Sequence, residues 1–357
     1  MPRPDGNPIL SVRSVFPAHR YPQAELSDAV AELSGLSADQ RAQLGRLHAH
    51  AGVEHRHTAL PLSGYAALRT VEASNDRYVD EAVDLGERAL RRALSAADVD
   101  PADLDALFVT SVTGVTVPSL DARLIPRLGL RPDIRRVPIF GLGCVAGAAG
   151  LARLHDYLLA WPQHHAALLA VEICSLSWPT TRITTADLVV TGLFGDGAAA
   201  VVAGGGGTRD APRVLATRSE VYPDSTDALG WRLGDDGFRI VLTAELADVV
   251  ERYLAGTVTA FLAEHDLTVE EISAWVCHPG GPKVLDAVQN SLKLPDSALA
   301  LSRRSLAEVG NVSSVSVLHI LEETLGQVAG ERPPPGSTGL MIGLGPGISA
   351  ELVLLRW

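Results

Sequence analysis

Cysteines, long apolar runs and excess positive charge are scarce in this chain of 357 residues, and each shortage excludes a class of protein. None of its three cysteines is in CxxC spacing, so the sequence predicts neither a disulfide framework nor a zinc site. No stretch approaches the roughly 18 apolar residues of a membrane helix, and the polar residues 1–7 do not resemble a targeting peptide. We therefore expect a cytoplasmic protein without a membrane segment.

The formal net charge of −12 argues against general binding to nucleic acids or membrane surfaces, so an anionic substrate would need a local basic patch. The histidines at 55–57 and 164–165 have no partners at metal-ligand spacing, and we expect both segments on the solvated surface. The remaining composition, 46% hydrophobic and 20% charged with 33 glycines, is typical of an α/β protein. A chain of this length forms one large domain or two medium ones.

Apolar patterning divides the chain into elements. Residues 1–60 are expected to be helical and peripheral, 75–94 and 120–128 to be helices, and 106–110 and 166–173 to be buried strands. A glycine run at 204–207 suggests a boundary between an N-terminal half, 1–205, and a C-terminal half, 206–357.

The second half resembles the first in outline. Residues 272–278 match 104–110 in pattern, and Gly310-Asn311 follows at nearly the same distance as Gly143-Cys144 does in the first half. This repeat suggests two copies of one α/β unit about a pseudo-twofold axis. Cys144 and Asn311 would then occupy equivalent turns that face each other, with His278 at the end of a neighbouring strand.

Cys144 lies where a short strand, 136–140, turns into a helix that extends to Pro162. The segment 141–150 is rich in glycine and alanine, which permits a tight turn. The positive end of the helix dipole favours thiolate over thiol, as in a nucleophile elbow. A buried structural cysteine fits the same residues, and this stretch alone leaves both interpretations open.

His278 and Asn311 could complete the chemistry of such a nucleophile. A cysteine beside a histidine can form a thiolate–imidazolium pair, and His278 and Asn311 could donate hydrogen bonds to a developing enolate or oxyanion. Alternatively, His278 could be a turn residue before Pro279, and Asn311 a helix cap. Cys277 should face away from the partners of His278, because neighbouring side chains on a strand alternate.

Five motifs, in order and near their expected spacing, resemble the type III polyketide synthases, the chalcone synthase-like family, and its bacterial branch in particular. They are Gly143-Cys144 with Ala146-Gly147, Leu193 to Ala199, His278 to Pro282, Gly310 to Ser314, and Gly343 to Gly347. The resemblance implies a thiolase fold, a duplicated α/β architecture of five αβαβα layers, in a homodimer with a Cys144–His278–Asn311 triad. It also implies acyl-CoA and malonyl-CoA as substrates, joined by decarboxylative condensation without a metal or organic cofactor.

The resemblance further implies which residues surround the substrate. Phe194 and Phe238 would gate the acyl cavity, and Gly343, Gly345, Pro346 and Gly347 would shape its wall. Basic residues would line the mouth of a coenzyme A tunnel. Arg56 fits this role moderately, and Lys283 is suggested by its place after the His278 loop.

The chain departs from the plant members at cavity positions. Val112, Cys174 and Ser177 stand where plant enzymes carry threonines. Without a hydroxyl at Val112 we expect no chalcone-type closure, and the segment 230–238 resembles the branch that makes alkylresorcinols and alkylpyrones. We therefore expect medium or long fatty acyl-CoA starters and alkylpyrone or alkylresorcinol products.

Other classes fit fewer residues. A ketoacyl synthase III of fatty acid priming also uses Cys, His and Asn, but the Gly343–Gly347 loop favours a polyketide synthase. Papain-like proteases carry their cysteine near the mature N-terminus in a Trp-containing signature, which is absent here. The glycine runs do not form the GxGxxG turn of a nicotinamide site, and intact triad spacing argues against a non-catalytic scaffold.

Overall fold

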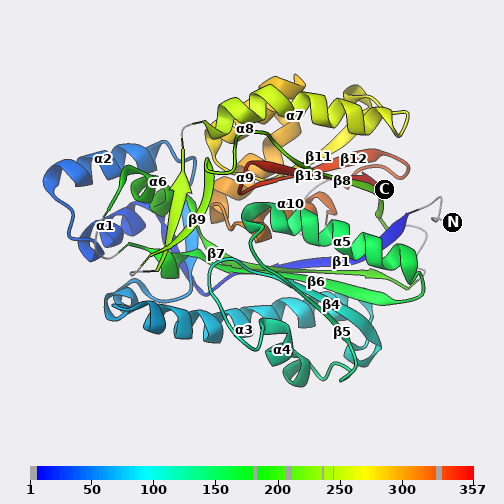
Figure 1. Ribbon diagram of the computed structural model, residues 1–357, viewed down its shortest axis with the longest axis horizontal. Helices are drawn as coiled ribbons and strands as arrows, with labels where there is room; N and C mark the ends of the chain where they lie inside the picture. Colours follow the sequence, from blue (N-terminus) through cyan, green and yellow to red (C-terminus); the bar gives the residue numbers. More distant parts are fainter. Residues whose placement is uncertain (1–5, 180–182, 206–210, 235–236, 244, 327–331) are drawn as a thin grey trace.

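A computed structural model describes residues 6–179, 183–205, 211–234, 237–243, 245–326 and 332–357. Its nine-stranded sheet, in the order β11-β12-β13-β8-β1-β7-β6-β4-β5, runs through two layers (Figure 1). The nine strands are β1 (Asn7–Val15), β4 (Leu104–Thr110), β5 (Arg135–Ile139), β6 (His165–Ile173), β7 (Asp196–Gly204), β8 (Arg213–Val221), β11 (Ile272–Cys277), β12 (Thr338–Gly345) and β13 (Ser349–Arg356).

Three layers of helices enclose and separate the two layers of strands (Figure 1). The central layer holds α5 (Ala146–Ala160) and α10 (Ser314–Thr324), each of which contacts strands of both sheet layers. The outer layers hold α3 (Val71–Ala97) and α4 (Leu120–Leu128) on one side, and α7 (Leu246–Ala263), α8 (Pro282–Leu292) and α9 (Ala300–Val309) on the other. The result is the five-layer αβαβα arrangement that the family resemblance implied.

The two halves of the sheet share one pairing pattern. In the first half β1 and β7 are antiparallel, β7 and β6 antiparallel, and β6 and β4 parallel. In the second half β8, β13, β12 and β11 repeat this series. The halves meet where Asn7 and Pro8 of β1 pair with β8. The topology is therefore that of a duplicated unit, and the expected boundary at 205–206 adjoins residues 206–210, which lie outside the described residues.

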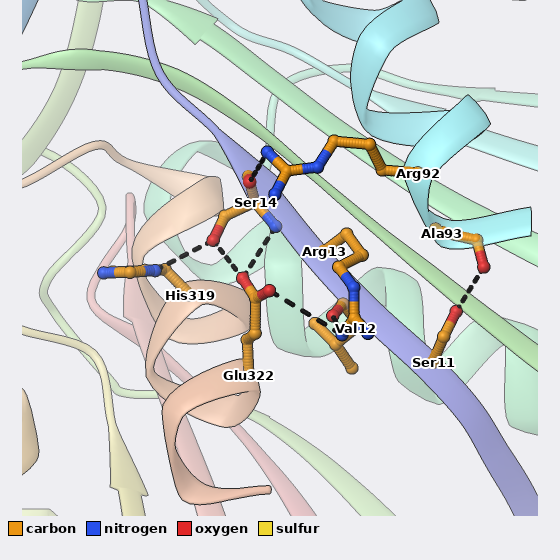
Figure 2. Close-up of polar contacts among 8 residues, drawn as sticks. All are labelled: Ser11, Val12, Arg13, Ser14, Arg92, Ala93, His319 and Glu322. Atoms are coloured by element: carbon orange, nitrogen blue, oxygen red, sulfur yellow. Dashed lines mark hydrogen bonds and ion pairs between the residues drawn. The ribbon is translucent and has the colours of Figure 1, made fainter. Parts of the chain in front are cut away.

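Residues 1–60 were predicted to be helical and peripheral, and this prediction is wrong for Asn7–Val15, which form strand β1. β1 is central in the sheet, and its polar side chains are paired rather than exposed (Figure 2). The Ser11 hydroxyl donates to a backbone carbonyl of α3 at 2.6 Å, and the Ser14 amide donates to Glu322 of α10 at 2.7 Å. The Ser14 hydroxyl also hydrogen-bonds Nδ1 of His319 at 2.9 Å. Partners on two helices therefore allow a partly polar strand to be buried.

An outer group of elements packs beside the layers, at the left of Figure 1. It contains helices α1 (Gln23–Leu33), α2 (Ala38–Ala49) and α6 (Thr185–Leu193), and the strand pairs β2 (His19–Pro22) with β3 (His55–Thr58) and β9 (Leu229–Gly234) with β10 (Gly237–Leu242). α6 contacts α1, α2 and β10, so this group covers one end of the sheet.

Short 3₁₀ helices connect several of these elements. They span Leu62–Ala67, Pro101–Asp103, Gly143–Val145, Cys174–Ser177, Val269–Glu271 and Asp296–Leu299. Within the described parts of the chain, we find no helix with both the length and the apolarity needed to span a membrane.

Candidate active site

Cys144 lies in a tight turn between β5 and α5. The turn is one 3₁₀ segment, Gly143–Val145, and α5 follows it directly. Gly143 has φ +54°, and a Cβ there would lie 2.6 Å from Cγ of Pro346, so any larger residue would force the two segments apart. The turn leaves Cys144 partly exposed.

His278 and Asn311 are each held by a hydrogen bond from the backbone amide to a neighbouring element. His278 follows β11, and its amide donates to the carbonyl of Ile342 on β12 at 2.9 Å. Asn311 follows α9, and its amide donates to the carbonyl of Leu193 at 2.8 Å. Both residues are buried, at 2% and 1% exposure.

One cavity of about 40 Å³ brings Cys144, His278 and Asn311 together. Oδ1 of Asn311 accepts from the Ser313 amide at 2.8 Å, which leaves the Asn311 NH₂ group free to donate elsewhere. Nδ1 of His278 is buried without a hydrogen-bond partner among the described residues. The other residues lining this cavity are Leu193, Phe194, Leu229, Ile240, Leu242, Leu246, Gly280, Val284 and Leu344.

Burial sets the charge state of the nucleophile and its base. It raises the pKa of the Cys144 thiol to about 12 and lowers the pKa of His278 to about 3. Burial therefore opposes the charged form of each group. The thiolate at the N-terminus of α5 stays a prediction, and transfer of the Sγ proton to His278 during attack is compatible with both pKa shifts.

A buried carboxylate, Glu172 of β6, lies behind the nucleophile and was not predicted as part of the site. It accepts hydrogen bonds from the Thr113 hydroxyl at 3.0 Å, the Ser314 hydroxyl at 2.5 Å and the Ser313 hydroxyl at 3.3 Å. Ser313 also lines the cavity at Cys144, and its side chain lowers the pKa of that thiol. Burial raises the pKa of Glu172 to about 7. A single charged residue within the apolar run 166–173 was the available signal.

Further small cavities lead from Cys144 toward the surface. The first, of about 20 Å³, lies at Cys144, and the second, also of about 20 Å³, lies beside Cys174. Both are lined by Phe194, Trp231 and Ile240. Ser177 and Phe238 then line both the second cavity and an outer cavity of about 400 Å³.

Two family models match the chain. The model for the N-terminal domain of chalcone and stilbene synthases matches residues 5–207, and that for the C-terminal domain matches residues 213–357. The chain belongs to the chalcone and stilbene synthase family. Members are type III polyketide synthases, acyltransferases that catalyse decarboxylative condensation.

Relatives of this polyketide synthase include bacterial enzymes with different products. A 1,3,6,8-tetrahydroxynaphthalene synthase from Streptomyces peucetius subsp. caesius is 51% identical over 99% of this chain and 93% of its own. An alpha-pyrone synthesis polyketide synthase-like protein from Mycobacterium tuberculosis is 30% identical over 93% of this chain and 86% of its own.

The fold of the polyketide synthase also matches solved structures. The crystal structure of the tetrahydroxynaphthalene synthase from Streptomyces coelicolor A3(2), a bacterial type III polyketide synthase, aligns with a TM-score of 0.92 at 30% identity. The alignment covers 98% of this chain and 99% of that one.

The structure of this polyketide synthase places several predicted cavity residues on the cavity walls. Phe194 and Pro346 line the cavity at Cys144, and Phe238 and Ser177 line the outer ones. The glycines of the 343–347 loop permit close packing on the Cys144 turn: a Cβ at Gly343 would lie 2.7 Å from Ala148, and one at Gly345 2.6 Å from the Val145 amide, while Gly347 has φ +67°.

Val112 does not line these cavities. Its amide donates to Glu172 at 3.1 Å, and the next residue, Thr113, is on the wall beside Cys144. The expectation of a wall without a hydroxyl at this point is therefore wrong, because Thr113 lines the cavity where Val112 was expected.

Arg56 does not lie at an open coenzyme A mouth or on the solvated surface. Its side chain is 0% exposed, and Nη1 donates to the carbonyl of Phe194 at 2.7 Å. A buried guanidinium cannot meet phosphates at the surface, so this expectation is wrong. Lys283 is exposed in the first turn of α8, directly after the loop that follows His278.

Proposed function

We propose that this type III polyketide synthase transfers an acyl group from coenzyme A to Cys144 and extends it with malonyl-CoA or an alkylmalonyl-CoA. The observation that carries the proposal is the single cavity lined by Cys144, His278 and Asn311. A nucleophile, a neutral base and an amide donor around one small space suit acyl transfer followed by enolate formation.

In the first step, Sγ of Cys144 attacks the thioester carbonyl while its proton passes to the unpartnered imidazole of His278, and coenzyme A leaves as the thiol. In the second step, malonyl-CoA loses CO₂, and the enolate oxygen receives hydrogen bonds from the Asn311 amide and the imidazole N–H. The enolate carbon then attacks the acyl thioester and displaces Cys144. The apolar lining from Leu193, Leu229 and Leu344 excludes water from the enolate.

Two product classes have support. The 51% identity to a 1,3,6,8-tetrahydroxynaphthalene synthase favours an aromatic hydroxynaphthalene as the product. The expected alkylpyrones or alkylresorcinols from fatty starters are the second candidate. They are supported by the outer cavity of about 400 Å³, with Leu176, Trp178 and Phe238 on its wall, and by the 30% identity to the pyrone-type relative.

The test is product analysis by mass spectrometry with malonyl-CoA alone and with malonyl-CoA plus dodecanoyl-CoA or coumaroyl-CoA. A hydroxynaphthalene from malonyl-CoA alone supports the first candidate. Alkylpyrones formed in preference to it support the second. Absence of an acyl group on Cys144 with all three thioesters would overturn the proposed function.

The same proposal includes the binding of coenzyme A, the cellular location of the protein and the role of each half of the chain. Lys283 is retained as a cation for the coenzyme A phosphates because it is exposed beside the His278 loop. A cytoplasmic location fits a reaction that needs a reduced thiol, and all three cysteines are free. The halves 1–205 and 206–357 supply the nucleophile and its partners, respectively.

A homodimer is supported by exposed apolar residues after two neighbouring strands. Val115 and Val117 follow β4, and Phe140 and Leu142 follow β5, at exposures of 49%, 91%, 61% and 39%. Because β4 and β5 are parallel, these two loops lie at the same end of the sheet. An apolar patch beside an edge strand is suited to pairing with a second copy.

A further inference from the structure

Arg56 is a fully buried cation close to the site, yet it lines none of the cavities at Cys144. It belongs to β3 and is among the largest side chains with no exposure. Burial lowers the pKa of Arg56 to about 10, and the nearby Asp196 opposes that shift, so the guanidinium is charged at neutral pH. Nη2 is buried without a partner among the described residues. Burying a charged guanidinium costs free energy of folding, so its contacts are expected to have a structural or functional role.

The guanidinium holds the segment that carries Phe194. Nη1 donates to the Phe194 carbonyl at 2.7 Å, and Nε donates to Oε1 of Gln23 at 3.0 Å. Gln23 in turn donates from Nε2 to the carbonyl of Gly192 at 2.7 Å. Arg56 and Gln23 therefore hold the C-terminal end of α6 by hydrogen bonds to two backbone carbonyls, those of Phe194 and Gly192.

The same segment is paired with Asn311. The Asn311 amide donates to the Leu193 carbonyl at 2.8 Å, and the Gly195 amide donates to the Asn311 carbonyl at 3.0 Å. These two hydrogen bonds enclose Phe194 and form a short parallel bridge. Any shift of the Phe194 backbone therefore moves Asn311 as well.

Glycines make room for the aliphatic part of Arg56 at this bridge. A Cβ at Gly310 would lie 2.9 Å from Cγ of Arg56 and 2.7 Å from the Leu193 carbonyl, and Gly310 has φ +74°. A Cβ at Gly195 would lie 3.7 Å from the same side chain. The arginine stem thus fills the space immediately before Asn311.

Asp196 connects this arrangement to the opposite wall of the cavity. Its carboxylate accepts from the Ser175 amide at 2.8 Å and from the Ala59 amide at 2.7 Å. Ser175 follows Cys174, which lines the cavity beside Cys144. Asp196 therefore links the chain just after β3 to the segment that carries Cys174, and its charge favours the charged form of Arg56.

We propose that Arg56 is a positioning residue that sets Asn311 and Phe194 relative to Cys144, acting through the Phe194 carbonyl rather than by touching substrate. The inference rests on the proposed function, because it assigns Arg56 to the extension step in which Asn311 donates. A lysine could not replace it, since one ammonium cannot reproduce the two fixed directions of Nε and Nη1. A misplacement of about 1 Å can reduce a rate by about 100-fold.

The test compares Arg56→Lys with the unaltered enzyme at each step. We expect one acyl group still to load on Cys144, KM for malonyl-CoA to change less than about twofold, and kcat for decarboxylation to fall by about 10- to 100-fold. Arg41→Lys is the matched control, because Arg41 also donates to two backbone carbonyls, on the outer group of helices, and should leave kcat unchanged.

Gln23→Ala keeps the hydrogen bond between Arg56 and the Phe194 carbonyl but removes the one between Arg56 Nε and Gln23. Because Gln23 is only half-buried, we expect the variant to fold and kcat to fall less, by about 3- to 10-fold. It decides the question if Arg56→Lys does not fold. A raised KM with unchanged kcat, or a lowered melting temperature with unchanged kcat per folded molecule, would overturn the positioning role. Failure of the unaltered enzyme to acylate Cys144 would instead overturn the proposed function.

Discussion

Cys144 has two polar neighbours with opposite effects on its thiol. The Ser313 hydroxyl lowers the pKa of Cys144, Glu172 raises it, and burial outweighs both. Burial of both groups therefore favours a neutral thiol beside a neutral imidazole before substrate binds.

Replacing the nucleophile should abolish loading. We expect Cys144→Ala to accept no acyl group, because no other described cysteine shares a cavity with His278. Intact-protein mass spectrometry after incubation with an acyl-CoA measures this directly. Cys174→Ala and Cys277→Ala are the controls and should load normally, since neither cysteine lines the cavity that holds His278. Acylation that persists in Cys144→Ala would contradict the assignment.

The Asn311 side chain should matter for extension but not for loading. Its Oδ1 is occupied by the Ser313 amide, so its NH₂ group is the donor available to the enolate. Asn311→Ala should load starter normally and lose malonyl-CoA decarboxylation by about 100-fold or more. Single-turnover assays of the two steps separate these effects, and an equal loss in both would point to a role in folding instead.

Glu172 should make stability depend on pH. Because burial raises the pKa of Glu172 from 4.5 to about 7, the folded state binds more protons than the unfolded state between these values. Stability should therefore fall as the pH rises from about 4.5 to about 7, by an amount on the order of 3 kcal/mol from this group.

The variant Glu172→Gln removes this titration and keeps a group of the same shape. Denaturant unfolding at several pH values should show a flatter dependence for the variant than for the unaltered protein. Parallel curves for the two proteins would show that Glu172 does not titrate in this range.

At the scale of elements, the contact between α5 and α10 depends on one glycine. A Cβ at Gly147 would lie 2.1 Å from the Ser314 carbonyl. Gly147→Ala should therefore destabilise the protein by about 1–3 kcal/mol, as overpacking does. Gly256→Ala, on the exposed face of α7 with nothing within 4 Å, should instead stabilise by about 0.5–1 kcal/mol. Thermal or denaturant unfolding measures both, and the same sign for both variants would contradict the argument.

Elements with regular apolar patterns could be predicted from the sequence. The helix at 120–128 and the strand at 166–173 match α4 and β6 closely, because each buries a continuous apolar face. β1 could not be predicted, because Arg13 and Ser14 interrupt its apolar pattern and find their partner, Glu322, more than 300 residues later.

The candidate site shows the same limit. The Cys144 turn was predicted from its small residues. The internal repeat predicted that Cys144 and Asn311 occupy equivalent turns that face each other. Arg56 was assigned to the coenzyme A mouth from the resemblance, and only the tertiary structure reveals the Phe194 carbonyl that it binds.

At the scale of the whole molecule, the apolar loops at 115–117 and 140–142 should govern assembly. We expect Val117→Asp to convert a dimer into a monomer, because a charge in the centre of an apolar interface is costly to bury. Light scattering after gel filtration gives the mass. Leu159→Asp is the control: Leu159 is 39% exposed near the C-terminal end of α5, whose other end follows the Cys144 turn, and the change should leave the dimer intact. An unchanged mass for Val117→Asp would exclude this surface as the interface.

The division of the site between two halves also has a consequence for the timing of synthesis. Ribosomes make the chain from its N-terminal end, so Cys144 emerges well before His278 and Asn311 exist. Until the second half folds onto the first, Cys144 has neither its base nor an oxyanion donor beside it. The complete reaction, and decarboxylation above all, therefore arises only when residues 278–311 have been made and have folded beside Cys144.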